Sequence, residues 1–88
     1  MEINLTHTFT EEIFEIVDYI SLDSIDRANN FREEVYSSLN SLKQFPNLGT
    51  KLENGKRKLI IHKNYIIYYK IKKDIIQILS IKHVKKRE

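Results

Sequence analysis

The carboxyl-terminal part of the chain alternates between apolar runs and short polar breaks. Isoleucine and tyrosine dominate residues 57–84, and β-branched and aromatic side chains are typical of half-buried strands. Breaks at 62–64 and 72–74 divide this stretch into three segments, which predicts an antiparallel meander. By strict alternation the last segment is apolar on both faces, with Ile76 and Ile78 on one side and Ile75, Leu79 and Ile81 on the other. Such a strand requires cover on both faces.

The first half of the chain has the periodicity of two amphipathic helices. Apolar residues recur at spacings of three and four: Phe9, Ile13, Ile16, Val17 and Ile20, and then Ile25, Ala28, Phe31, Val35, Leu39 and Leu42. Thr8 and Glu11 form a capping-box signature that predicts the start of the first helix. Asp23 or Ser24 is expected to cap the second helix, and Pro46 to end it. So short a link predicts an antiparallel hairpin that covers one face of the sheet.

Residues 3–7 alternate apolar and polar side chains as a short edge strand does. The predicted order is therefore strand, helix, helix and three strands, an α+β fold (β-α-α-β-β-β) with the helical hairpin packed on a small antiparallel sheet. We expect a single domain over residues 1–88, with a basic tail at 82–88. A chain of 88 residues has a modest core, and an obligatory partner is consistent with that size.

Composition narrows the possible classes of protein. The chain has no cysteine, which excludes disulfides and thiolate metal sites and favours the cytoplasm. No apolar run approaches the roughly 20 residues of a membrane span, and the amino terminus lacks a secretion-signal pattern. The three histidines are scattered without carboxylates at ligand spacing, and no glycine-rich phosphate loop is present. We therefore expect no metal, no cofactor and no membrane partner.

The two halves of the chain differ in charge. Residues 1–44 contain nine acidic and three basic residues, whereas residues 45–88 contain twelve basic and three acidic ones. A basic half built around a sheet indicates a polyanionic or acidic partner, either nucleic acid or protein. The alternative is that the lysines only keep a sheet edge soluble and unpaired.

Several short motifs, in this order and spacing, resemble the RelE/ParE superfamily of toxins from bacterial type II toxin–antitoxin systems. These motifs are Ile16-x-x-Tyr19-Ile20, Ala28-x-x-Phe31, Leu42-x-x-Phe45-Pro46-x-x-Gly49, Arg57-x-Leu59, the Tyr-Ile-Ile-Tyr-Tyr run at 65–69, and the segment from Ile78 to Arg87. The resemblance covers nearly the whole chain. It implies a helical hairpin on an antiparallel sheet, and an antitoxin whose carboxyl-terminal segment wraps around the toxin in a hetero-oligomer.

The superfamily has two branches, which imply different activities. RelE-like members cleave mRNA in the ribosome, and ParE-like members inhibit DNA gyrase. RelE-like enzymes resemble one another in a Tyr-Arg-x-x-Tyr pattern, and here Ile66 stands where the phosphate-binding arginine would be. An alkyl side chain cannot donate a hydrogen bond to phosphate, so the departure counts against RNA cleavage. We favour the ParE-like branch and assign no catalytic residues; a ribonuclease would rely on His83, Arg57 and Lys58.

Under the ParE-like interpretation, function lies in two binding surfaces. The residues expected to bind the target are Arg57, Lys82, His83, Lys85, Lys86 and Arg87. The residues expected to bind the antitoxin are Ile66, Tyr68, Phe31 and Val35. A third alternative is an inactive toxin fold that acts only as a binding module.

Overall fold

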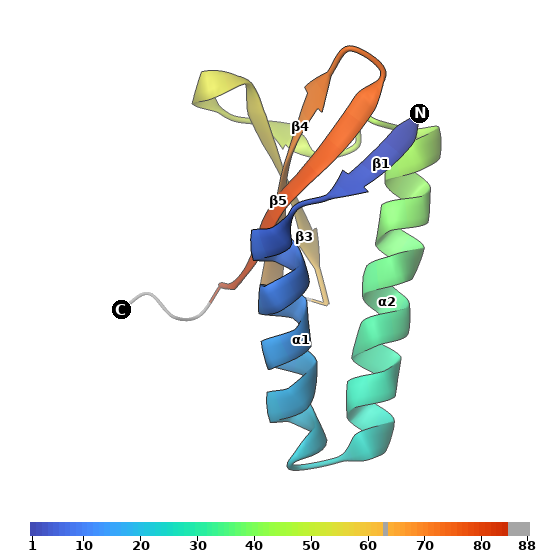
Figure 1. The fold of residues 1–88 in the computed structure, drawn as a ribbon, viewed down its shortest axis with the longest axis vertical. Helices are drawn as coiled ribbons and strands as arrows, with labels where there is room; N and C mark the ends of the chain where they lie inside the picture. The colour runs from blue at the N-terminus through green and yellow to red at the C-terminus, as the bar shows by residue number, and fades with distance from the viewer. Residues whose placement is uncertain (63, 85–88) are drawn as a thin grey trace.

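Two helices cover one face of a five-stranded sheet in the computed structural model, which describes residues 1–62 and 64–84 (Figure 1). The elements in chain order are β1 (Glu2–Leu5), α1 (His7–Ser21), α2 (Ile25–Gln44), β2 (Thr50–Lys51), the short 3₁₀ helix η1 (Glu53–Gly55), β3 (Lys56–Ile61), β4 (Tyr65–Lys72) and β5 (Ile75–His83). The predicted β-α-α-β-β-β order is confirmed. The additions are β2 and η1, which are too short to produce a periodic pattern.

The strands lie in the order β1-β5-β4-β3-β2. Strands β2 to β5 pair antiparallel, as the meander predicts. The amino-terminal strand lies at an edge as expected, but it pairs parallel to β5, from Glu2 opposite Ile75 to Leu5 opposite Ile78. The sheet is therefore mixed, because the two helices return the chain to the same end of the sheet before the meander begins.

The first helix begins two residues earlier than its capping signature predicts. The N-cap is Thr6, whose hydroxyl accepts a hydrogen bond from the Phe9 backbone N–H at 3.2 Å. The same hydroxyl donates to the backbone carbonyls of Ile78 and Leu79 on β5. The prediction that Thr8 and Glu11 cap the first helix was wrong. Thr6 caps it instead, because its hydroxyl can bond to the helix and to the edge of β5 at the same time. Ser24 caps the second helix as expected, through Arg27 N–H at 3.1 Å.

A β-bulge changes which residues of β5 face the helices. Tyr68 lies opposite Ser80 and Tyr69 opposite Ile78, so Leu79 is an extra residue in β5. Beyond the bulge, Ile81 returns to the helix-covered face and is only 1% exposed. The prediction that placed Ile81 on the other face was wrong, because strict alternation does not continue across a bulge.

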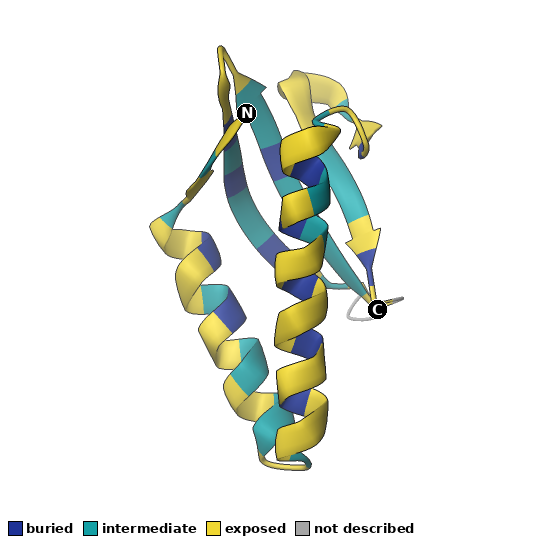
Figure 2. Cartoon of the chain, turned by 90° about the vertical axis from the view of Figure 1, so that its right-hand side faces the viewer, coloured by how far each residue is buried: buried dark blue, intermediate teal, exposed yellow. Residues whose placement is uncertain are grey.

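The core lies between the helical hairpin and one face of the sheet, and Figure 2 shows the buried positions of α1 and α2 turned toward the strands. It contains most of the predicted helical stripe and alternate residues of the strands: Phe9, Ile13, Phe31, Val35, Leu39, Leu42, Ile61, Ile67, Tyr69, Ile76, Ile78 and Ile81. Ile16, Val17 and Ile20 of the stripe pack against this core and are partly buried, whereas Ile25, at the start of α2, is 67% exposed, so its prediction as a core position was wrong. Neither α1 nor α2 lies on the opposite face of the sheet, where the short η1 borders Tyr68 and Ser80. The sequence predicted cover on both faces of the last strand, and the helical hairpin supplies it on one face.

The loop after α2 is held by the buried Tyr69. The Tyr69 hydroxyl donates to the Pro46 carbonyl at 2.8 Å and accepts from the Gly49 N–H at 2.8 Å. A Cβ on Gly49 would lie 2.6 Å from the Lys58 carbonyl oxygen and 2.8 Å from the Tyr69 ring. Glycine is therefore required here by the close approach of β3 and β4 to the loop.

Candidate functional site

The face of the sheet away from the helices, here called the open face, carries three rows of residues paired across β3, β4 and β5. The rows are Lys56, Lys70 and Gln77; Lys58, Tyr68 and Ser80; and Ile60, Ile66 and Lys82. Apart from the exposed Lys56, Ile60 and Lys82, the side chains of these rows are half-buried. Lysines therefore border an aromatic and aliphatic centre that a partner can reach.

Two of the four residues expected to bind an antitoxin lie on this open face. Ile66 and Tyr68 are half-buried neighbours on β4. The other two, Phe31 and Val35, are 1% and 0% exposed and belong to the core beneath the sheet. A partner could reach them only by separating α2 from the sheet. Their assignment is corrected: the helical periodicity that singled them out marks the face that packs inside.

Arg57 is held by the loop after α2. Its Nη1 donates to the Gly49 carbonyl at 2.9 Å and to the Asn47 carbonyl at 3.4 Å. The residue lies opposite Tyr69, four positions along β4 from the Tyr65–His83 pair. At the usual rise per residue that is about 13 Å. Arg57 therefore stabilises the loop and lies apart from Lys82 and His83, the other expected target-binding residues that the structure describes.

The residues that a ribonuclease would use are not brought together. Arg57 and Lys58 are consecutive in β3 and so point to opposite faces of the sheet. His83 lies at the far end, where its ring packs edge-on against Tyr65 with centroids 4.7 Å apart. Tyr65 in turn packs on Phe31 at 4.8 Å. His83 is thus part of an aromatic stack on the helix-covered side.

Two residues of the predicted basic tail at 82–88 belong to a strand. Lys82 and His83 are the last residues of β5, paired with Ile66 and Tyr65. Lys82 lies in a row of the open face, whereas His83 packs toward the helices. Lys85, Lys86 and Arg87, also expected to bind the target, lie outside the described residues.

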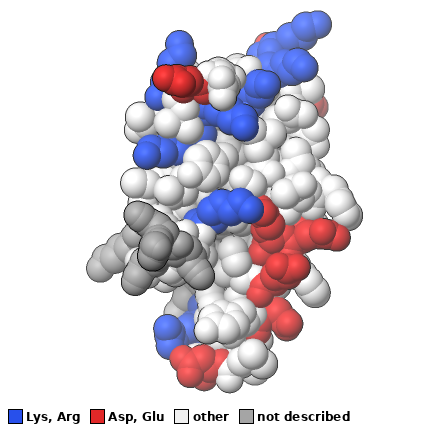
Figure 3. All heavy atoms as spheres, turned by 90° about the vertical axis from the view of Figure 1, so that its left-hand side faces the viewer, with Lys and Arg blue, Asp and Glu red and all other residues white. Residues whose placement is uncertain are grey.

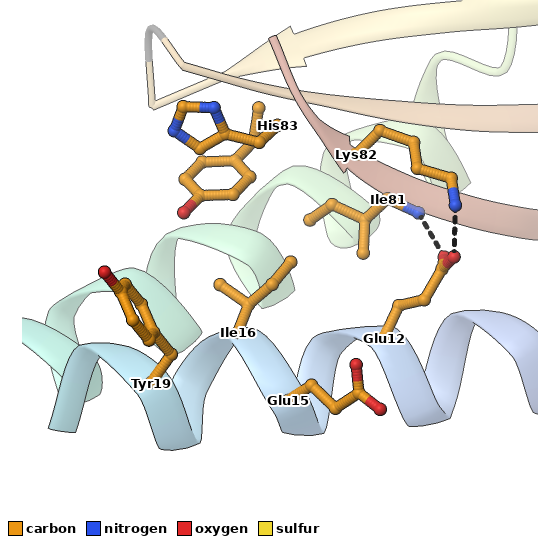
Figure 4. Close-up of a pocket in the computed structure, with 8 residues that line it drawn as sticks. Glu12, Glu15, Ile16, Tyr19, Ile81, Lys82 and His83 are labelled. Atoms are coloured by element: carbon orange, nitrogen blue, oxygen red, sulfur yellow. Dashed lines mark hydrogen bonds and ion pairs between the residues drawn. The ribbon is translucent and has the colours of Figure 1, made fainter. Parts of the chain in front are cut away.

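A groove runs between α1 and the end of β5, with a volume of about 520 Å³ (Figure 4). Its lining comes from residues far apart in the sequence: Glu12, Glu15, Ile16, Tyr19, Tyr65, Ile81, Lys82 and His83. We call it the α1–β5 groove. Figure 4 shows Glu12 and Ile16 projecting from α1 toward Ile81, with Glu15 and Tyr19 beside them.

On the outer edge of β5, the Glu12 carboxylate accepts a backbone hydrogen bond that a neighbouring strand would otherwise accept. Strand β1 pairs with β5 only as far as Ile78. Beyond that point one Glu12 oxygen accepts the Ile81 backbone N–H at 3.0 Å, and the other lies 2.6 Å from Lys82 Nζ. The Glu12 carboxylate therefore satisfies an edge N–H that would otherwise lack a protein partner.

Two tyrosines contribute to the same groove. Burial, and secondarily the Tyr19 hydroxyl, raise the pKa of Tyr65 above its ordinary value. Both rings line the groove. Tyr19 itself is 74% exposed, so one aromatic ring of the groove is open to solvent and the other is packed.

Charge is unevenly distributed over the surface. Figure 3 shows Lys and Arg gathered at the upper end of the molecule, and Asp and Glu mainly over its lower part. The α1–β5 groove lies where the acidic helix meets the basic sheet, with Glu12 and Glu15 from one and Lys82 from the other. The sequence analysis did not predict this groove. The one sequence signal for it is weak: Glu12 directly precedes the buried Ile13, so its carboxylate lies near the side of α1 that faces the sheet.

Residues 3–87 match the family described as the ParE toxin of the type II toxin–antitoxin system, parDE. No curated protein matches the sequence. Among solved structures, a chain of the chromosomal ParDE toxin–antitoxin system from P. aeruginosa is similar, with a TM-score of 0.82. It is 24% identical over 97% of each chain, so this likeness concerns the fold.

Within residues 1–62 and 64–84, neither helix is long and apolar enough to cross a membrane.

Proposed function

We propose that this chain, which belongs to the ParE family of toxins from type II toxin–antitoxin systems, arrests growth by inhibiting DNA gyrase until a cognate antitoxin neutralises it. The observation that carries the proposal is the family match over residues 3–87. Because a shared fold alone does not determine activity, the residues themselves must fit the proposal. The proposal includes a cytoplasmic location, which the lack of cysteine favours.

The arrangement of cations supports inhibition by binding in preference to RNA cleavage. Cleavage by a 2′-hydroxyl needs cationic donors gathered around one phosphate. Here Ile66 supplies no donor, and the Arg57 guanidinium is committed to the Gly49 and Asn47 carbonyls. Loss of a single such donor typically lowers an enzyme's rate by about 10²–10³-fold. This argument favours the ParE-like activity over the mRNA endoribonuclease alternative.

The proposed target surface is the basic carboxyl-terminal end, from Lys82 to Lys85, Lys86 and Arg87. Lys82 is 59% exposed and extends from the last strand. Lys82 pairs with Glu12 but remains exposed at the end of the sheet that the tail follows. Arg57 is set aside because it lies four positions along β4 from the Tyr65–His83 pair and donates to the carbonyls of its own loop. His83 contributes by orienting the end of β5 through its packing on Tyr65.

The proposed antitoxin surface is the centre of the open face, at Ile66 and Tyr68. Ile66 is the cross-strand neighbour of Lys82, and such side chains lie about 5 Å apart. An antitoxin segment that covers Ile66 therefore also covers Lys82. Neutralisation then follows from simple occlusion of the target surface, because the two surfaces share one row of the sheet.

Expression of the chain without antitoxin tests the activity. We expect growth arrest, intact mRNA in primer extension, and loss of gyrase supercoiling of plasmid by the purified protein. Lys82→Ala is expected to weaken inhibition, and Lys72→Ala, which alters an exposed lysine near the opposite end of the sheet, serves as the matched control. Ribosome-dependent mRNA cleavage with normal supercoiling would contradict the proposal. Normal growth with neither effect would favour the binding-module alternative.

Co-expression with the cognate antitoxin tests the second surface. Ile66→Glu places a carboxylate in the centre of the open face and is expected to abolish neutralisation while the protein still folds. Phe14→Glu, at a residue 74% exposed on α1, is the control and should leave neutralisation intact. Full neutralisation of the Ile66→Glu variant would place the antitoxin elsewhere.

A further inference from the structure

We propose that the α1–β5 groove receives an arginine side chain carried by the extended toxin-binding segment of the antitoxin. The inference rests on the proposed function for the identity of the partner. The basic half of the chain indicates a partner with acidic residues. At the groove, the inference assigns that partner a cationic side chain in addition to those acidic residues.

The lower part of the groove fits an aliphatic stem. Ile81 is 1% exposed and Ile16 is half-buried, and both line the groove between α1 and β5. An arginine side chain has three methylene groups that pack on such apolar surface while its charged end remains near water. The groove is open along its length, so the side chain can enter without displacing core residues.

The charge of the groove favours a cation. Lys82 and the Ile81 N–H together satisfy Glu12. Glu15 lines the same groove, and in the described part of the chain its carboxylate has no ion-pair or hydrogen-bond partner. Among the described residues, Glu15 therefore supplies one negative charge of the groove that is left for a ligand. A charge-assisted hydrogen bond at a partly enclosed site is stronger than an exposed ion pair.

The aromatic side chains favour arginine over lysine. Tyr19 and Tyr65 both line the groove. A planar guanidinium stacks on an aromatic ring and directs several N–H donors toward a carboxylate at once, which an ammonium group does not. Tyr19 is the exposed ring on which it would stack.

The position of the groove indicates how the antitoxin reaches it. Lys82 belongs both to the open-face row that contains Ile66 and to the lining of the groove. On the outer edge of β5, no strand of the described chain pairs beyond Ile78, and Glu12 of α1 borders this edge instead. A segment that covers Ile66 and Tyr68 continues around this edge into the groove. The groove and the open face are therefore two parts of one continuous surface.

Nuclear magnetic resonance of the full chain tests the inference with defined probes. N-acetyl-arginine amide is titrated against the ¹⁵N-labelled protein, and N-acetyl-citrulline amide serves as the neutral probe of the same shape. We expect saturable shifts at the amides of Ile81, Lys82 and His83. The arginine probe should bind about fivefold more tightly than the citrulline probe, as one partly enclosed ion pair implies.

Matched variants locate the charge. Glu15→Gln should reduce arginine binding to the level of citrulline, and Tyr19→Ala should weaken it further. Glu11→Gln removes the same charge from the same helix, but outside the groove, and should change nothing. Equal binding of the two probes, shifts located elsewhere, or an equal loss in the Glu11→Gln variant would overturn the inference. If a variant fails to fold, the comparison of probes on the unaltered chain decides.

The result is independent of the gyrase proposal. A chain that binds the arginine probe but does not inhibit gyrase leaves the groove standing and removes only the proposed target. A chain that inhibits gyrase but does not discriminate between the probes removes the groove and leaves the toxin activity standing.

Discussion

The two faces of the sheet are made by the same strands and have opposite roles. On the helix-covered face, Ile67, Tyr69, Ile76 and Ile78 are 0% exposed and form the core with α1 and α2. On the open face, their sequence neighbours Ile66, Tyr68 and Lys70 are only half-buried. The side-chain chemistry of the two faces is similar, since both contain isoleucine and tyrosine. The difference is that the chain covers one face itself and leaves the other available for a partner.

This comparison teaches that apolar character in a small domain does not by itself identify the core. In this 88-residue chain, α1 and α2 are the two α-helices of the described residues that can cover the sheet. An aliphatic row such as Ile60 and Ile66, bordered by Lys82, is the kind of surface that a partner completes. The following substitutions test the comparison in pairs.

The largest difference in stability between the two faces is expected when neighbouring isoleucines are truncated. Ile67→Ala leaves a cavity among fully buried side chains and is expected to lower the free energy of unfolding by about 3–4 kcal/mol. Ile66→Ala removes the same atoms from the open face and should lower it by less than about 1 kcal/mol. Urea denaturation of both variants measures the difference. Equal losses would show that the open face is as important to the core as the covered face.

Gly49→Ala should have the next largest effect. The added methyl group collides with the Lys58 carbonyl and the Tyr69 ring, so the loop must move, at a cost of about 2–3 kcal/mol in unfolding free energy. The control is Gly55→Ala, which meets no atom within 4 Å but has φ +75° and should lose about 1 kcal/mol through backbone strain alone. Thermal denaturation ranks the two. A larger loss at Gly55 would contradict the packing argument.

Removal of one hydroxyl tests the two faces at the level of hydrogen bonds. Tyr69→Phe leaves the Gly49 N–H and the Pro46 carbonyl without their partner and should lower the unfolding free energy by about 1–2 kcal/mol. Tyr68→Phe on the open face should change it by less than about 0.5 kcal/mol. Amide hydrogen exchange at Gly49 should accelerate only in the first variant. Unchanged protection there would refute the role of Tyr69 in holding the loop.

The smallest effect is expected at the edge where the two faces meet. Glu12→Gln keeps an oxygen for the Ile81 N–H but loses the charge that pairs with Lys82, so we expect a loss of about 0.5 kcal/mol. Glu12→Ala removes both interactions and should lose about 1–1.5 kcal/mol, with faster amide exchange at Ile81. Glu15→Gln is the neighbouring control and should leave stability unchanged. Protection of Ile81 that persists in Glu12→Ala would show that another group borders this edge.

Much of the fold was predictable because it depends on local periodicity. The two helical stripes, the breaks near 62–64 and 72–74 and the order of elements follow from spacing along the chain. The alternation in β4 also placed Ile66 and Tyr68 together on one face, as the structure has them. Errors arose where two distant segments meet. Thr6 serves as a cap because β5 lies beside it, and Ile81 changes face because Leu79 bulges against β4.

The candidate site was less predictable for the same reason. Arg57 has the charge expected of a target-binding residue, but the carbonyl of Gly49 engages it. Phe31 and Val35 lie on the helical stripe that packs inside. Glu12 reaches the backbone of a residue 69 positions away, a contact that no spacing rule contains.

The sequence by itself therefore determined the elements, their order and the residues that line each strand face up to the bulge, because these depend on short-range steric preferences and on a hydrophobic period. The tertiary structure alone decided the parallel pairing of β1, the bulge at Leu79, the engagement of Arg57 and the α1–β5 groove. Each of these depends on which backbone groups of distant segments need a hydrogen-bond partner once the helices have packed on the sheet.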